Sequence, residues 1–260
     1  MTYHGSRIRE NIKALISVMA GNCPKYLALG SAVVLFFLAC TNDKAEEPRK
    51  EAPVVVFKSR PQALSQEQRN ELGFPPEVIS QVETTAGAAA EPFFETVWIP
   101  SKNLKGDIML GRERLAGVSV HTTKAEKTIN VLSEILLKQG YLIFRSEQNY
   151  GSVPDVVSVI KGTSQYDILT VQKTEGPNYK LTTTAIVRWL KVRQKKHPFV
   201  ITGAGPDWVE ARFIRPPKDM SAFAREVYVF APDVVTQGAG TIPRLARQMK
   251  ESNGFYLWWD

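Results

Sequence analysis

Three carboxylates in the C-terminal third of the chain are the residues best suited to catalysis. Asp207 follows a Gly-Pro turn, Glu210 lies in the run WVEARF, and Asp233 follows a proline. Two carboxylates can serve as general acid and general base where their surroundings separate their pKa values. These three are therefore the candidate catalytic residues of a hydrolase. A structural role is the alternative, because acids at turns commonly accept hydrogen bonds from backbone N–H groups.

Aromatic and polar residues of the same region are candidates for binding. Trp208, Arg212, Gln237 and Trp258 combine large apolar surfaces with polar groups, as ligand sites do. Trp258 and Trp259 are neighbours in an expected terminal strand, so their side chains point to opposite faces. One of them then lies under a covering helix or is partly exposed, and exposure would indicate a binding surface. Core packing is the alternative interpretation of these tryptophans.

The sequence indicates neither a metal site nor a cofactor. The run Gly203-Ala204-Gly205 lacks the third glycine of a dinucleotide-binding loop, and no G-x-S-x-G nucleophile motif is present. His121 and His197 stand apart, without the spacing of metal ligands. We therefore expect no metal and no cofactor.

Helical and extended patterns alternate around the candidate residues. In the strand expected over 208–214, Trp208, Glu210 and Arg212 share one face, and the apolar residues between them share the other. Asp219 and Thr241 are predicted to cap the last two helices. The chain ends in an expected strand over 255–260.

The remaining elements follow from apolar periodicity and turn residues. Thr123 and Glu126 have the spacing of a capping box, which predicts a helix that ends before Gly140. Other helices are expected over 64–72 and 76–82 and from Thr183 onward. Strands are expected over 54–57, 118–121, 141–144, 156–160, 166–171 and 199–202.

This interleaving predicts an α+β fold with a mixed, mostly antiparallel sheet flanked by helices. Residues 116–260 form the expected α+β domain. Residues 54–115 are expected to be a helical or irregular N-terminal region, with a strand or irregular packing segment at 93–99 and a loop at 102–114.

The N-terminal sequence resembles a bacterial lipoprotein signal. Residues 26–39 are an uncharged apolar run that is too short for a comfortable membrane span, and Ala39 and Cys40 follow the pattern of a lipidation site. We expect a signal peptide over 1–39, whose true start is possible at Met19, lipidation of Cys40, and a flexible tether over 40–53. An uncleaved anchor helix is the alternative. In a host with two membranes, Thr41 matches the outer-membrane sorting pattern, on the periplasmic side.

The charge of the chain gives little indication of a nucleic-acid partner. The formal net charge is +7, of which residues 1–39 contribute +3 and the remainder +4. The remaining excess is spread without a basic block, so we expect no nucleic acid.

Four runs of residues carry a resemblance to a known family. They are YDILTVQKTEGPNY, ITGAGPDWVEARF, DMSAFAREVYVFAPDVVTQGAGT and the terminal LWWD. They are similar to the bacterial family called domain of unknown function 4253, and they place a family-like core at 166–260. Ala231 stands where the family pattern would place a cysteine. The resemblance implies no activity.

The sequence therefore favours a lipid-anchored envelope protein of unknown biochemical function that acts as a binding module. Its expected partners are the membrane, through Cys40, and a protein. The alternative is a hydrolase that uses paired carboxylates of the C-terminal domain.

Overall fold

The structure is a computed structural model that describes residues 63–103 and 106–260. The signal peptide, Cys40, the tether and the strand expected at 54–57 lie outside the described residues.

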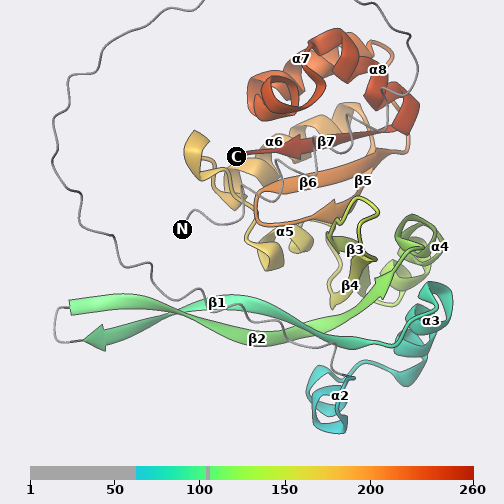
Figure 1. The fold of residues 1–260 in the computed structure, drawn as a ribbon, viewed down its shortest axis with the longest axis vertical. Helices are drawn as coiled ribbons and strands as arrows, with labels where there is room; N and C mark the ends of the chain where they lie inside the picture. The colour runs from blue at the N-terminus through green and yellow to red at the C-terminus, as the bar shows by residue number, and fades with distance from the viewer. Residues whose placement is uncertain (1–62, 104–105) are drawn as a thin grey trace, which may run out of the picture.

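A single twisted sheet of seven strands organises the described chain (Figure 1), in the order β1-β2-β4-β3-β5-β6-β7. The pairing of β3 with β5 is parallel and the other pairs are antiparallel. The predicted α+β class with a mixed, mostly antiparallel sheet is confirmed. The strands are β1 (Glu91–Asn103), β2 (Gly106–Thr122), β3 (Tyr141–Glu147), β4 (Asp155–Lys161), β5 (Phe199–Ala204), β6 (Trp208–Phe213) and β7 (Gly254–Trp258).

Two hydrophobic cores form on the opposite faces of this sheet. On one face, Val120, Ile143 and Val159 pack with the helices α2 (Gln66–Leu72), α3 (Pro76–Ala86) and α4 (Ala125–Lys138). On the other face, Phe144 and Phe213 belong to a larger core. That core includes residues of α5 (Asp167–Gln172), α6 (Thr183–Lys196), α7 (Met220–Phe230), the π-helical turn η2 (Val234–Ala239) and α8 (Ile242–Ser252). A short 3₁₀ turn, η1 (Pro177–Tyr179), precedes α6.

Side-chain caps fix the start of the C-terminal helices. Asp219 accepts the backbone N–H of Ala222, and Thr241 accepts that of Arg244, which confirms both predicted caps. The capping box predicted from Thr123 is wrong: α4 begins at Ala125 without a side-chain cap. Glu126, which the capping box would have engaged, instead lines the groove described below.

The loop predicted over 102–114 is also wrong. Residues 102–103 and 106–114 belong to β1 and β2, which pair as a long antiparallel hairpin that extends away from the body of the domain (Figure 1). The outer part of this hairpin pairs with itself rather than with the central strands, so its sequence need not show the apolar alternation of a half-buried strand. The position between 115 and 116, where the α+β domain was expected to begin, lies within β2.

The strand predicted over 166–171 is a helix, α5. Its apolar residues Ile168 and Leu169 are both buried in the larger core. Apolar residues at 166, 168, 169 and 171 fit one turn and a half of helix as well as a strand, and periodicity cannot separate the two over so short a run.

The chain end is held in the core, as expected. Trp259 donates its backbone N–H to Asp207 O and its indole Nε1–H to Phe230 O, both at 3.0 Å. Gly176 makes room for it, since a Cβ there would lie 2.9 Å from Trp259 Cγ. Gly205 does the same for Trp208, whose Nε1 would lie 2.1 Å from such a Cβ. These motif glycines are therefore explained by close packing against tryptophans.

Candidate binding groove

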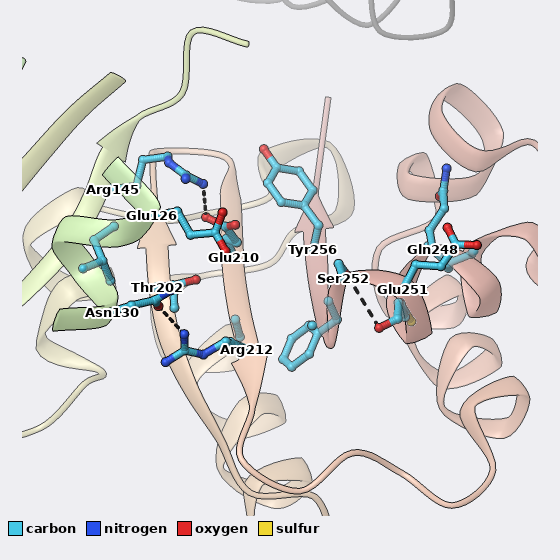
Figure 2. A pocket seen from close by; sticks show the side chains of 16 residues that line it. Glu126, Asn130, Arg145, Thr202, Glu210, Arg212, Gln248, Glu251, Ser252 and Tyr256 are labelled. Carbon is cyan, nitrogen blue, oxygen red and sulfur yellow. Dashed lines mark hydrogen bonds and ion pairs between the residues drawn. The ribbon is translucent and has the colours of Figure 1, made fainter. Parts of the chain in front are cut away.

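A groove of about 480 Å³ lies over β5, β6 and β7, between α4 and α8 (Figure 2). Strand alternation places Glu210, Arg212 and Tyr256 on this face, whereas their neighbours Ala211 and Phe255 are buried residues of the larger core. Helix α4 forms one side of the groove and α8 forms the other side. The sheet is thus exposed between two helical walls.

The floor of the groove holds an ion pair that crosses three strands. In register, Arg145 of β3 pairs with Gly203 of β5, which pairs with Glu210 of β6. Arg145 Nη1 lies 2.5 Å from Glu210 Oε2, and Arg145 Nε lies 3.1 Å from Asp155 Oδ2. Because Gly203 has no side chain, the arginine can reach across it. A Cβ at Gly203 would lie 3.1 Å from Glu210 Oε2.

Glu210 is the groove carboxylate with a perturbed proton affinity. Burial raises its pKa above the ordinary value, although the charge and hydrogen bond of Arg145 oppose this shift. The negative charges of Glu126 and Asp155 raise the pKa further. The Glu210 side chain keeps 31% of its surface exposed, against 11% for Arg145, so solvent in the groove reaches the carboxylate.

An aromatic group borders the same floor. Tyr256 stacks on Trp208 with ring centroids 5.7 Å apart, and its side chain hydrogen-bonds to Tyr150. Tyr150 lies in the loop between β3 and β4 with a left-handed backbone conformation, φ 50°. Burial raises the pKa of both tyrosines, and the charges of Asp207 and Glu210 contribute in the same direction. Both phenols therefore remain protonated donors near Glu210.

The walls of the groove present polar side chains beside the apolar Ile129, Leu245 and Met249. Arg212 Nη1 donates to Asn130 Oδ1 and so joins β6 to α4. The wall on the α8 side presents Gln248, Glu251 and Ser252 (Figure 2). Amides, carboxylates and guanidinium groups offer both donors and acceptors to a ligand.

Asp233 lies away from this groove and holds the chain end in place. Its Oδ1 accepts from Tyr179 Oη at 2.8 Å and from Gln237 Nε2 at 3.1 Å, and its Oδ2 accepts the backbone N–H of Asp260 at 2.9 Å. Burial, the hydrogen bond to Asp233 and the charges of Asp233 and Asp260 raise the pKa of Tyr179 to about 12. These contacts fit the structural alternative for Asp233.

The other sequence-predicted residues lie in the groove, beneath it, or beside Asp233. Glu210 and Arg212 line the groove, and Trp208 supports it from below Tyr256. Asp207 is close enough to Tyr150 and Tyr256 to raise their pKa values, but it does not line the groove. Gln237 contacts Asp233.

Trp258 is buried in the larger core, as is Trp259, so neither tryptophan of the chain end is exposed. Within the described residues the indole Nε1–H of Trp258 has no hydrogen-bond partner. The expected separation of the two side chains is not observed: both belong to the same core, because β7 ends at Trp258 and Trp259 lies beyond the alternation of the strand.

Sequence reasoning missed Arg145, Glu126, Asn130 and Tyr256 as groove residues. Arg145 carried a signal, because it is a charged residue in the otherwise apolar start of YLIFRSE. Glu126 and Asn130 are four residues apart and so share a helix face. That spacing is common on solvent-facing helix surfaces. Only the fold shows that these two residues line a groove rather than an open surface.

Two further properties concern the described residues alone. They contain no group of three or more His, Cys, Asp or Glu side chains that could hold a metal ion. They also contain no helix long and apolar enough to cross a membrane.

Comparison with known families identifies the C-terminal part. Residues 156–260 match the model of DUF4253, a domain of unknown function. The resemblance expected from the sequence is supported for this part of the chain, and the match begins ten residues before the expected core at 166–260. The parts of the groove from β5, β6, β7 and α8 lie within the residues that match DUF4253, whereas Glu126, Asn130 and Arg145 precede them. No curated protein and no solved structure matches the chain.

Proposed function

We propose that this chain is a lipid-anchored protein of the bacterial envelope that binds a protein partner in the groove between α4 and α8. The observation that carries the proposal is a hollow over an uncovered part of the sheet, lined by side chains that offer donors, acceptors and both signs of charge. A protein segment can occupy such a site with its polar side chains paired to the walls.

The anchor in this proposal is Cys40, and its basis is the sequence 26–40. In a host with two membranes, the protein sits on the periplasmic side of the outer membrane. The polar run from 41 to 53 serves as the tether that lets the folded part reach its partner.

Affinity capture from host envelopes tests the binding role. The full-length wild-type chain is compared with Gln248→Arg/Ser252→Arg, which changes two exposed groove residues. The matched control is Val131→Arg/Ile135→Arg, which adds the same charge on the exposed face of α4. We expect one partner to be retained by wild type and control and lost by the groove variant. Capture that is equal in all three proteins would contradict the proposal.

A hydrolase is the second candidate, and the observation that favours it is the pair Glu126 and Glu210. Both carboxylates line the groove, and the negative charge of Glu126 disfavours ionisation of Glu210. A carboxyl with a raised pKa can act as general acid beside an ionised general base. Of the three carboxylates expected from sequence, only Glu210 lines the groove; Asp207 does not line it, and Asp233 is engaged at the chain end.

Turnover of chromogenic ester, amide and glycoside substrates tests the hydrolase. Activity that disappears in Glu210→Gln and in Glu126→Gln, but persists in Glu134→Gln on the solvent-facing side of α4, would support it. Activity that is absent from the wild type, or that survives both groove variants, would leave binding as the role of the site.

A further inference from the structure

The outer surface of α6 and α7 is the most basic helical surface of the described chain. Helix α6 contains five basic residues, Arg188, Lys191, Arg193, Lys195 and Lys196, and no acidic residue. Arg193 is engaged with Glu226 of α7, at 3.1 Å, and with the ring of Trp189. The other four are exposed. We call these four, together with exposed Arg225 of α7, the basic face.

Helix geometry explains why the basic face is continuous. Arg188, Lys191 and Lys195 are spaced at i, i+3 and i+7, which places them on one side of α6. Trp189 stacks on Phe230 with ring centroids 4.5 Å apart, so α6 and α7 lie side by side in one layer. Arg225 therefore extends the same surface rather than forming a separate one.

Exposed apolar side chains accompany these cations. Val192 of α6 is 48% exposed and Val229 of α7 is 81% exposed. A surface that combines several lysines and arginines with small apolar contacts suits the headgroup region of a bilayer, where cations meet anionic phosphates and apolar groups leave water.

The basic face and the groove lie on opposite sides of the sheet. Phe223 of α7 contacts the rings of Phe213 and Phe255, at 5.4 and 5.3 Å, on the face that α6 and α7 cover. The side chains next to them along the strands, Arg212 and Tyr256, point to the other face and line the groove, which Phe255 also borders. A surface in contact with the basic face would therefore leave the groove open.

From this arrangement we propose that the basic face docks on an anionic phospholipid surface. If the chain carries the proposed lipid anchor, on which this orientation rests, docking adds a second membrane contact and directs the groove away from the bilayer. The charge complementarity is local, since the net charge outside residues 1–39 is only +4. A nucleic acid is disfavoured as the occupant, because the aromatic rings beside these cations, Tyr166 and Trp189, are covered by Lys191 and Arg193 and leave no free face for base stacking.

Lysine footprinting on the full-length chain tests this docking. The protein is reconstituted into vesicles of phosphatidylglycerol and phosphatidylethanolamine, or of phosphatidylcholine alone, and its amines are acetylated and quantified by mass spectrometry. We expect acetylation of Lys191, Lys195 and Lys196 to be at least fivefold slower on the anionic vesicles. Lys138 of α4 should react equally on both, and 1 M NaCl should remove the protection by screening.

Charge-reversed variants locate the contact while leaving these lysines in place as reporters. Arg188→Glu/Arg225→Glu should abolish the protection, whereas Arg244→Glu/Arg247→Glu, with the same change of charge on exposed residues of α8, should retain it. Equal acetylation on anionic and neutral vesicles would overturn the proposal. So would equal loss of protection in both variants, or protection by single-stranded RNA without protection by anionic vesicles.

Discussion

Arg145 Nη1 lies 2.5 Å from Glu210 Oε2 across the backbone of Gly203, which separates the two residues in the sheet. The contact joins residues 65 positions apart in the sequence. It links β3, which pairs in parallel with β5, to the floor of the groove. The groove therefore depends on Arg145, which precedes the residues that match DUF4253, and on Gly203, which lies within them.

Gly203→Ala tests the space that this ion pair requires. The new Cβ would lie 2.9 Å from Trp208 Cζ3 and 3.1 Å from Glu210 Oε2, so these neighbours must shift. We expect a loss of about 1–3 kcal/mol in the free energy of unfolding, measured by urea denaturation. The control is Gly238→Ala, where the nearest atom is 3.7 Å away and the change should be small. Equal stability of the two variants would contradict this packing account.

The titration of Glu210 reports the electrostatics of the groove. An NMR titration of its side-chain carboxyl carbon should give a pKa above the ordinary glutamate value. Arg145→Gln should raise this pKa further, because it removes the favourable positive charge. Glu126→Gln should lower it, because it removes a neighbouring negative charge. Glu134→Gln, a change on the solvent-facing side of α4, should leave it unchanged; an effect as large as that of Glu126→Gln would refute the assignment.

The raised pKa of Glu210 also affects stability. Between the pKa of the unfolded chain and that of the folded protein, the folded state binds more protons at this residue. Its contribution to the free energy of unfolding therefore falls as pH rises through the folded pKa. Glu210→Gln should remove this part of the pH dependence, and an unchanged profile would show that the carboxyl is not perturbed in the folded state.

Asp233 and Tyr179 provide a test of the chain-end cluster. Asp233→Asn removes a negative charge beside Tyr179, so the pKa of Tyr179 should fall from about 12. An absorbance titration, with Tyr179→Phe to assign the signal, measures the shift. Asp219→Asn, at the start of α7, is the matched control and should not change this pKa. The same pKa for Tyr179 in the wild type, Asp233→Asn and Asp219→Asn would show that Asp233 does not raise it.

The Asp233 carboxylate is also expected to stabilise the fold. Its removal in Asp233→Ala leaves the donors from Tyr179, Gln237 and the Asp260 backbone without their acceptor. We expect a loss of about 2–4 kcal/mol in the free energy of unfolding.

Lipidation is a separate prediction about the N-terminus. Cys40→Ala should abolish incorporation of labelled palmitate in the host, because the thiol is the attachment point. Cys23→Ala should leave the label in place, since Cys23 lies within the expected signal peptide. Continued labelling of Cys40→Ala, or loss of label in Cys23→Ala alone, would refute the assignment.

The sequence predicted those elements that are determined by local chemistry. Asp219 and Thr241 cap helices because their side chains reach nearby backbone N–H groups, and the alternation from Trp208 to Arg212 identifies a half-buried strand. The same reasoning failed for α5, whose short apolar run suits a helix and a strand equally.

The groove depended on information that no local pattern contains. Arg145 meets Glu210 only because β5 lies between their strands with a glycine at the shared register. Glu126 and Asn130 become wall residues only because α4 covers part of the sheet. The order of strands determines both, and this order arises from long-range pairing.

Site-specific photo-crosslinking in host envelopes tests the binding account most directly. A photoreactive amino acid is placed at Gln248 or Glu251, which line the groove, and at Arg247 or Lys250, which are exposed neighbours on the same helix. The account predicts a single discrete protein adduct from positions 248 and 251, and none from 247 and 250. No adduct from the groove positions, or the same adduct from all four, would contradict it.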